Sequence, residues 1–230
     1  MSRLAKQAKW RLNAVNARVY EPGLMIPGDS VFEHRGAWHE RVFGNDKPIT
    51  VELGCGKGTF AVELARRFPE RNIVGVDVKG HRFFTGVQMA DELGLDNLAF
   101  LRISVQEIER AFAPGEVDEI WLTFSDPQPK DGRGTKRITS GRFFERYRRV
   151  GRPGARAHIK TDSPLVYSLA LEELGPDFLM QSDDVHGGYL NGVPEPMGSL
   201  LAFQTPYESR WIREGRRIHF LSLELVPSAG

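Results

Sequence analysis

The stretch of sequence that decides the fold reads Val51-Glu52-Leu53-Gly54-Cys55-Gly56-Lys57-Gly58-Thr59. It joins an apolar run at 48–54, typical of a buried strand, to residues 59–68, whose apolar side chains recur at helical spacing. Glycines let the backbone turn tightly and let a ligand approach closely, and the N-terminus of the following helix offers free N–H groups. The sequence therefore predicts a strand, a glycine loop and a helix that together can hold a cofactor.

The glycine loop is compatible with two classes of cofactor. A dinucleotide site has the pattern G-x-G-x-x-G, whereas here Thr59 stands at the sixth position and Gly58 comes one residue early. Glu52, two residues before Gly54, would repel a diphosphate but would attract a sulfonium or an amino group. The loop therefore favours S-adenosylmethionine over a nicotinamide dinucleotide, and a tight turn without a ligand is the remaining alternative.

Strand-like and helix-like segments alternate after the glycine loop. Further strands are expected at 72–77, 97–103, 117–124, 154–162, 178–184 and 217–225. Further helices are expected at 81–95, 140–151 and 164–175, and a loop rich in glycine and proline at 185–206. This alternation predicts an α/β fold, with a seven-stranded, mostly parallel sheet and helices on both faces.

The strand expected at 117–124 ends in the polar turn Ser125-Asp126-Pro127-Gln128-Pro129-Lys130. Parallel sheets bind ligands beyond the carboxyl ends of their strands, so Asp126 is expected beside the glycine loop. A surface turn stiffened by its two prolines is the alternative. Asp77, 23 residues after Gly54, ends the second expected strand (72–77) and could accept hydrogen bonds from ribose hydroxyls.

Composition excludes several classes of protein. The chain has 230 residues, of which 40% are hydrophobic and 27% charged, as in soluble globular proteins. It has no apolar run of about 18 residues, and its start lacks the pattern of a secretory signal. The one cysteine, Cys55, cannot form an intramolecular disulfide, the six histidines show no metal-ligand spacing, and a cytoplasmic location is predicted.

Positive charge is concentrated in two segments, although the formal net charge is only +1. Residues 1–18 hold five cations and no acid, within a basic N-terminal extension (1–45) that precedes the main domain (46–230). Residues 130–156 hold ten cations and two acids. Such concentration suggests a polyanionic partner such as nucleic acid, and solvated helix faces are the alternative.

Three segments of this sequence, in this order, resemble the bacterial TrmB-type tRNA (guanine-N7-)-methyltransferases. They read VELGCGKGTF (51–60), FSDPQPKDGRGTKR (124–137) and TPYESRWIREGRRIHFL (205–221). The resemblance implies a Rossmann-like, S-adenosylmethionine-dependent methyltransferase that methylates N7 of a guanine in the variable loop of tRNA. It also implies a cytoplasmic enzyme that needs neither a membrane nor a metal.

The resemblance further implies roles for matching residues. The cofactor would be bound by Glu52, Gly54, Gly56, Asp77, Ser104 and Asp126. Asp126 would also be catalytic, and tRNA would be bound by Lys130, Asp162, Thr205, Tyr207 and Glu208. For Asp162, the N-cap of a helix beginning at Pro164 is an equal alternative.

The sequence departs from the family pattern at Ser104, Ser125 and Gln128, which indicates a divergent branch. Two further functions therefore stay open: a methyltransferase with a small-molecule or protein acceptor, and a tRNA-binding protein without catalysis. The first would not need the basic run beside the catalytic turn, and the second would bind S-adenosylmethionine poorly. A nicotinamide oxidoreductase is the least favoured function, because Thr59 breaks its fingerprint.

Overall fold

The computed structural model describes residues 5–9, 16–23, 30–128 and 136–226, so Lys130 lies outside the described residues. The strands are β1 (Val19–Tyr20), β2 (Ile49–Leu53), β3 (Asn72–Val76), β4 (Leu98–Leu101), β5 (Val117–Thr123), β6 (Gly151–Thr161), β7 (Phe178–Ser182) and β8 (His219–Glu224). The α-helices are α2 (Thr59–Arg67), α3 (Phe84–Glu92), α4 (Ile108–Ala111), α6 (Gly141–Val150), α7 (Pro164–Leu174), α8 (Met197–Ala202) and α9 (Pro206–Arg213). Shorter helical turns are η1 (His39–Phe43), η2 (Val105–Glu107) and η4 (Tyr189–Gly192).

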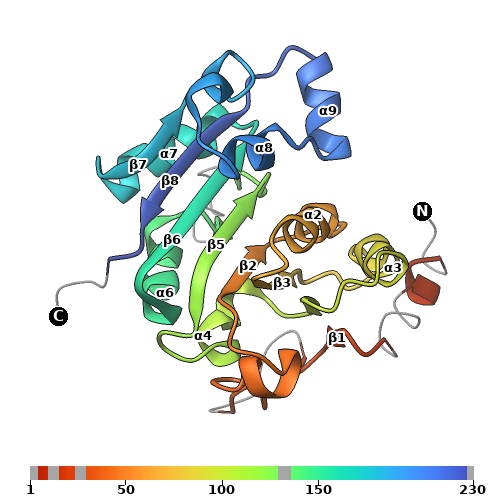
Figure 1. Ribbon diagram of the computed structural model, residues 1–230. Helices are drawn as coiled ribbons and strands as arrows, with labels where there is room; N and C mark the ends of the chain where they lie inside the picture. The colour runs from red at the N-terminus through yellow and green to blue at the C-terminus, as the bar shows by residue number, and fades with distance from the viewer. Residues whose placement is uncertain (1–4, 10–15, 24–29, 129–135, 227–230) are drawn as a thin grey trace.

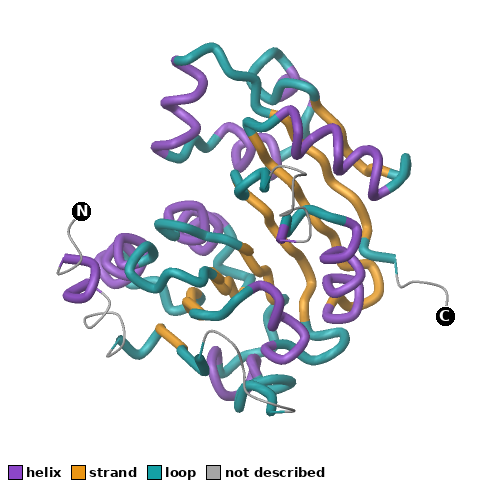
Figure 2. Tube along the Cα trace, turned by 180° about the vertical axis from the view of Figure 1, so that it is seen from behind, coloured by secondary structure: helices purple, strands orange, loops and turns teal. Residues whose placement is uncertain are grey.

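The described strands form one sheet in the order β1-β4-β3-β2-β5-β6-β8-β7. The pairs from β1 to β6 are parallel, and β8 runs antiparallel to both β6 and β7. Helices lie over both faces (Figures 1 and 2). The predicted α/β fold is confirmed, with eight strands instead of seven, because the two residues of β1 are too few to show a strand pattern.

Successive residues of the inner strands contribute to two separate apolar clusters, one on each face. Ile120 and Leu122 of β5 pack with side chains of α6 and α7, whereas Trp121 between them packs with side chains of α2 and α8. Both faces of the sheet are thus covered, so its inner strands are mostly apolar on both sides instead of alternating regularly with exposed polar residues.

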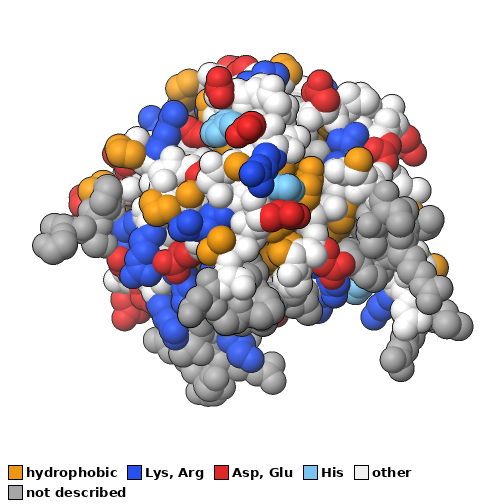
Figure 3. Space-filling view, turned by 90° about the horizontal axis from the view of Figure 1, so that it is seen from below, with side chains coloured by type: hydrophobic (Ala, Val, Ile, Leu, Met, Phe, Trp, Pro, Cys, Tyr) orange, Lys and Arg blue, Asp and Glu red, His pale blue; other side chains and the backbone are white. Residues whose placement is uncertain are grey.

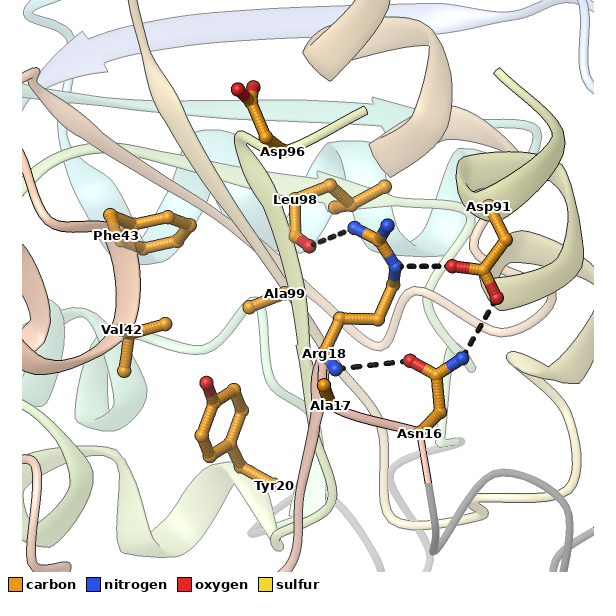
Figure 4. Close-up of a pocket in the computed structure, with 10 residues that line it drawn as sticks. All are labelled: Asn16, Ala17, Arg18, Tyr20, Val42, Phe43, Asp91, Asp96, Leu98 and Ala99. Atoms are coloured by element: carbon orange, nitrogen blue, oxygen red, sulfur yellow. Dashed lines mark hydrogen bonds and ion pairs between the residues drawn. The ribbon is translucent and has the colours of Figure 1, made fainter. Parts of the chain in front are cut away.

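Part of the N-terminal extension packs onto the sheet. Trp38 is fully buried, its indole N–H donates to the carbonyl of Ala111 at 2.9 Å, and its ring stacks on Phe112 at 4.9 Å. At the β1 edge, Arg18 donates to Asp91 at 2.8 Å and to the carbonyl of Leu98 at 3.2 Å, beside a surface pocket of about 300 Å³ (Figure 4). Arg18 is therefore held by the fold, and the domain boundary after residue 45 stays a prediction.

The expected loop at 185–206 is wrong, because it contains η4 and α8. Directly after it, α9 is a helix that the sequence pattern did not predict. The prolines of this stretch suggested a loop, but they stand where helices begin: Pro196 is the N-cap of α8 and Pro206 lies in the first turn of α9. A residue in the first turn needs no backbone N–H for the hydrogen bonds of the helix, so proline is tolerated there. Helices of six and eight residues are also too short to show a clear apolar period.

Candidate active site

The sheet places two loops side by side at its switch point. β2 pairs with β3 on one side and with β5 on the other, so the direction of the chain across the sheet reverses between β2 and β5. Ligands of open α/β sheets bind beyond the carboxyl ends of the strands at such a point. The arrowheads of β2 and β5 point to the side of the molecule where α9 lies (Figure 1). The glycine loop follows β2 there, and the turn with Asp126 follows β5.

The glycine loop has a backbone conformation that requires its glycines. Gly54, Gly56 and Gly58 have φ values of +76°, +56° and +74°, in the left-handed region that other residues rarely adopt. A Cβ atom on Gly58 would also lie 2.6 Å from the ring of Phe100. Between these glycines, burial raises the pKa of the Cys55 thiol well above its ordinary value, with Glu52 and Asp77 adding to the effect. Cys55 therefore stays protonated and fills space, as expected.

Asp77 joins the glycine loop to the loop after β3. One carboxylate oxygen accepts a hydrogen bond from the backbone N–H of Gly56 at 3.0 Å, and the other from that of Lys79 at 2.7 Å. Burial raises the pKa of Asp77, and these two N–H groups oppose the shift. Because each oxygen has a second lone pair, the carboxylate can still accept bonds from two hydroxyl groups. Its position is the one that the ribose-binding prediction requires.

Glu52 is a buried acid with one carboxylate oxygen free to accept a hydrogen bond. Its side chain is almost fully buried, and the Thr123 hydroxyl donates to its Oε1 at 2.5 Å. Its Oε2 has no hydrogen-bond partner among the described residues. Burial raises the pKa of Glu52 to about 8; the Thr123 hydroxyl and the backbone N–H of Ala61 oppose this shift, and the negative Asp77 adds to it. An ammonium donor would satisfy Oε2 and favour the charged carboxylate. The site therefore fits a ligand with a cationic amino group, as S-adenosylmethionine has.

Glu52→Gln is expected to change how stability depends on pH. The folded protein keeps a proton on Glu52 up to about pH 8, whereas an unfolded carboxyl releases it near 4.5. The free energy of unfolding should therefore fall as the pH rises through this window, by on the order of 4 kcal/mol at most. The glutamine variant should lack that fall, which urea denaturation at pH 5, 7 and 8.5 would measure. Glu92→Gln, at an exposed site on α3, is the control, and parallel profiles for wild type and Glu52→Gln would contradict the prediction.

The turn after β5 holds Asp126 in a strained backbone. Phe124 and Gln128, which flank it, have φ values of +50° and +41° and are the two non-glycine residues with positive φ in the described chain. Such strain persists where the surroundings impose it and often accompanies function. The exposed carboxylate of Asp126 accepts a hydrogen bond from the backbone N–H of Gln128 at 3.1 Å. Asp126 is thus fixed at the end of β5 with its carboxylate accessible.

Two further predicted site residues, Ser104 and Asp162, follow other strands of the sheet. Ser104, after β4, caps η2 by accepting from the N–H of Gln106 at 3.3 Å. Asp162, after β6, accepts from the guanidinium of Arg216 at 2.8 Å. The N-cap of α7 is Ser163, so the alternative role predicted for Asp162 is wrong.

The segment Thr205–Glu208 begins α9 and has one buried and one exposed side. Thr205 is the N-cap and accepts from the N–H of Glu208 at 3.2 Å. Tyr207 is 52% exposed, whereas Glu208 is fully buried. Glu208 Oε1 lies 2.7 Å from the Lys160 ammonium and 2.9 Å from His186 Nε2. The carboxylate of Glu208 therefore anchors α9, and a direct contact between Glu208 and a substrate stays a prediction.

Most cations of the second basic segment that the structure describes have acidic partners. Arg146 and Arg149 pair with Glu109 at 2.7 and 2.9 Å. Similar pairs are Arg137–Glu173, Arg148–Glu145 and Arg152–Asp118. In Figure 3, Lys and Arg side chains stand among Asp and Glu on the face seen from below. Charge counting along the sequence therefore overestimated the free positive charge of 136–156.

A smaller group of cations lies near the cofactor loop. Lys79 and Arg82 are exposed in the segment between β3 and α3, and Lys9 of the N-terminal extension has its ammonium 5.1 Å from the centre of the Phe84 ring. The pKa of His81 is lowered by burial and then by the nearby charges of Lys6, Arg82 and Lys79. These effects show that the N-terminal extension and the β3–α3 segment bring their cations together.

The described residues contain neither a metal-binding cluster nor a membrane-spanning helix. No group of three or more His, Cys, Asp or Glu side chains in them could hold a metal ion. None of the helices in that part of the chain combines the length and apolar character needed to cross a membrane.

Comparisons with known proteins identify the family of this chain. A family model described as "Putative methyltransferase" matches residues 46–221. A tRNA (guanine-N(7)-)-methyltransferase of Bacteroides thetaiotaomicron is 42% identical over 204 residues, which cover 86% of this chain and 77% of that protein. One of Christiangramia forsetii is 39% identical over 223 residues, 96% of this chain and 97% of that protein. Among solved structures, the 16S rRNA methyltransferase KamB has a TM-score of 0.58 at 17% identity and covers 87% of this chain and 98% of its own.

The strand order, the glycine loop and the acids beyond β2 and β3 define a Rossmann-like methyltransferase, and the likeness to KamB supports this fold. Identity near 40% over most of both chains is more specific. The chain belongs to the family of tRNA (guanine-N(7)-)-methyltransferases. The resemblance carried by the three sequence segments is thereby confirmed.

Proposed function

We propose that this protein transfers a methyl group from S-adenosylmethionine to N7 of a guanine in tRNA, and that the guanine lies in the variable loop. The observation that carries the proposal is the placement of Glu52 and Asp77 at one glycine loop, with the turn that holds Asp126 following β5, the strand that pairs with β2. Family membership supports the choice of acceptor. The proposed location is the cytoplasm, where tRNA is the partner.

The cofactor is proposed to lie along the carboxyl ends of β2, β3 and β4. When bound, S-adenosylmethionine supplies an electrophilic methyl group on a sulfonium. Glu52 would bind its amino group through Oε2, and Asp77 would bind its ribose hydroxyls. The backbone at Gly54 and Gly56 would allow close approach, and the segment capped by Ser104 would lie at the adenine end. These roles rest on the burial and the spare acceptor capacity of the acids.

The reaction needs little acid–base chemistry from the protein. Guanine N7 has an exposed lone pair, so no base is required to activate it, and the methylated base becomes positively charged. Catalysis should therefore depend on positioning and electrostatics. Asp126 is proposed to hold the guanine edge through its N–H groups and to stabilise the developing positive charge. Asp162, Thr205, Tyr207 and Glu208 are proposed to form the tRNA side of the site, together with Lys130.

The N-terminal extension is proposed to bind the tRNA backbone. Lys6 and Lys9 lie with Lys79 and Arg82 near the cofactor loop. Lys6→Ala/Lys9→Ala is therefore expected to weaken tRNA binding and to make the negative slope of log K against log salt shallower by about 1.5, since each lost phosphate contact removes roughly 0.7–0.9 from its magnitude. Binding titrations between 50 and 200 mM salt would measure this. Lys47→Ala/Arg66→Ala, two cations before β2 and at the end of α2, is the control, and equal slopes in all three proteins would argue against the contact.

The proposed function is tested by methyl transfer from radiolabelled S-adenosylmethionine to unmodified tRNA transcripts. The labelled nucleotide is mapped by borohydride–aniline cleavage, which cuts at N7-methylguanine. Label at a single guanine of the variable loop is expected, together with its loss when that guanine is replaced by adenine. Cofactor binding without label would point to another acceptor, and tRNA binding without cofactor binding would point to a protein that has lost catalysis.

A further inference from the structure

Helix α9 forms a wall of the candidate active site. The Trp211 ring lies 5.0 Å from that of Phe124, two residues before Asp126. One turn earlier on the helix, the Tyr207 ring lies 5.2 Å from the ammonium of Lys57, which belongs to the glycine loop. The helix therefore contacts both loops at the switch point through side chains.

The rings of Tyr207 and Trp211 lie on the side of α9 away from Glu208, which anchors the helix. Tyr207 and Trp211 are four residues apart, so they share one face of the helix, and their rings stack at 6.0 Å. Glu208 and Ile212 point to the protein interior instead: Glu208 is fully buried and Ile212 packs against the apolar cluster under α2 and α8. Packing of the core thus does not require aromatic side chains at positions 207 and 211.

Cations lie at both rings. Besides Lys57 at Tyr207, the guanidinium of Arg216 lies 5.9 Å from the centre of the Trp211 ring. Arg216 is also held by Asp162 at 2.8 Å. In both contacts the cation lies over the face of the ring. Such a pair matches the chemistry of a nucleotide, because a base can take the place of the cation on the ring and the cation can then pair with the phosphate.

We propose that Trp211, together with Tyr207, is the stacking surface that receives the target guanine, and that Arg216 and Lys57 bind the phosphates beside it. This inference rests on the proposed function and adds a specificity-determining residue to it. The side chain of Trp211 orients the base, whose N7 then faces the site next to Asp126. Glu208 and Lys160 contribute by fixing the helix that carries both rings.

The test compares tRNA methylation by wild type, Trp211→Phe and Trp211→Ala. Loss of one base–aromatic stack should lower kcat/KM for tRNA by roughly 5- to 150-fold in Trp211→Ala, while Trp211→Phe stays within a few fold of wild type. Affinity for S-adenosylmethionine, measured by calorimetry, should be unchanged in both variants. Leu179→Ala, which removes an exposed apolar side chain from β7, is the matched control.

Tryptophan fluorescence gives a second readout. The chain has four tryptophans, and Trp10 belongs to the N-terminal extension proposed to bind tRNA, so quenching is compared in a Trp10→Phe background. Trp38 and Trp121 are fully buried, so unmodified tRNA should quench Trp10→Phe through Trp211 and should quench Trp10→Phe/Trp211→Phe less. Wild-type kcat/KM in Trp211→Ala would overturn the inference and leave the proposed function intact. Parallel losses of thermal stability and cofactor affinity in both variants would also overturn it, by showing that Trp211 only packs the helix. Absence of methyl transfer by wild type would instead refute the proposed function, and this inference with it.

Discussion

Asp126→Asn is expected to lower kcat for tRNA methylation by at least about 100-fold, with affinity for S-adenosylmethionine within a few fold of wild type. The variant keeps the turn, because an asparagine oxygen can still accept the hydrogen bond from Gln128, but it loses the negative charge that opposes the cation forming on guanine. Asp126→Ala removes both features and should abolish turnover. Single-turnover methyl transfer and calorimetric titration of the cofactor measure the two quantities separately.

The control for Asp126 is Asp96→Asn. Asp96 is an exposed carboxylate at the pocket beside β1, at the end of the sheet opposite the catalytic turn (Figure 4). The Asp96→Asn variant should methylate tRNA with the kcat of wild type. A kcat of Asp126→Asn equal to that of wild type would remove Asp126 from the mechanism and would require another group beside the glycine loop to stabilise the methylated base.

Lys160→Met is expected to cost roughly 3–5 kcal/mol of unfolding free energy, because it leaves a buried charge without its partner. The Lys160 ammonium pairs with Glu208 at 2.7 Å and also donates to the carbonyls of Leu201 and Phe203 at 2.8 and 3.1 Å. Lys160→Met/Glu208→Gln should recover only part of that free energy, since both carbonyls still lack a donor. Urea denaturation at pH 7 measures all three proteins.

The matched control for Lys160 is Arg210→Ala on the surface of α9. Arg210 pairs with Glu214 at 2.7 Å, but the Arg210 side chain is 71% exposed. Arg210→Ala should therefore lower the free energy of unfolding by at most about 1 kcal/mol. Lys160→Met should also raise KM for tRNA more than it lowers cofactor affinity, because it loosens the helix that carries Tyr207 and Trp211. Equal stability of Lys160→Met and Arg210→Ala would show that the buried pair does not anchor α9.

The sequence alone determined the sheet and the acids at its edge. The order of strands and helices and the glycine loop are local patterns, and parallel strands necessarily bring their carboxyl ends to one edge. Glu52, Asp77 and Asp126 could therefore be placed near one another from their positions after three strands. The three segments that resemble the tRNA methyltransferase family added the expectation that the methyl group is transferred to tRNA. The roles of these acids stay predictions until the variants are measured.

Tertiary structure alone decided what surrounds those acids. Nothing local distinguishes Glu208, which is buried against Lys160, from an exposed helix glutamate, because its burial depends on a strand distant in the sequence. Likewise, the arginines of α6 look like a free basic face until Glu109 is brought beside them. The position of Trp211 at the active site also depends on α9, a helix too short for its own sequence to specify. Local patterns set backbone conformation, whereas burial, ion pairing and ring contacts are properties of residues that only folding brings together.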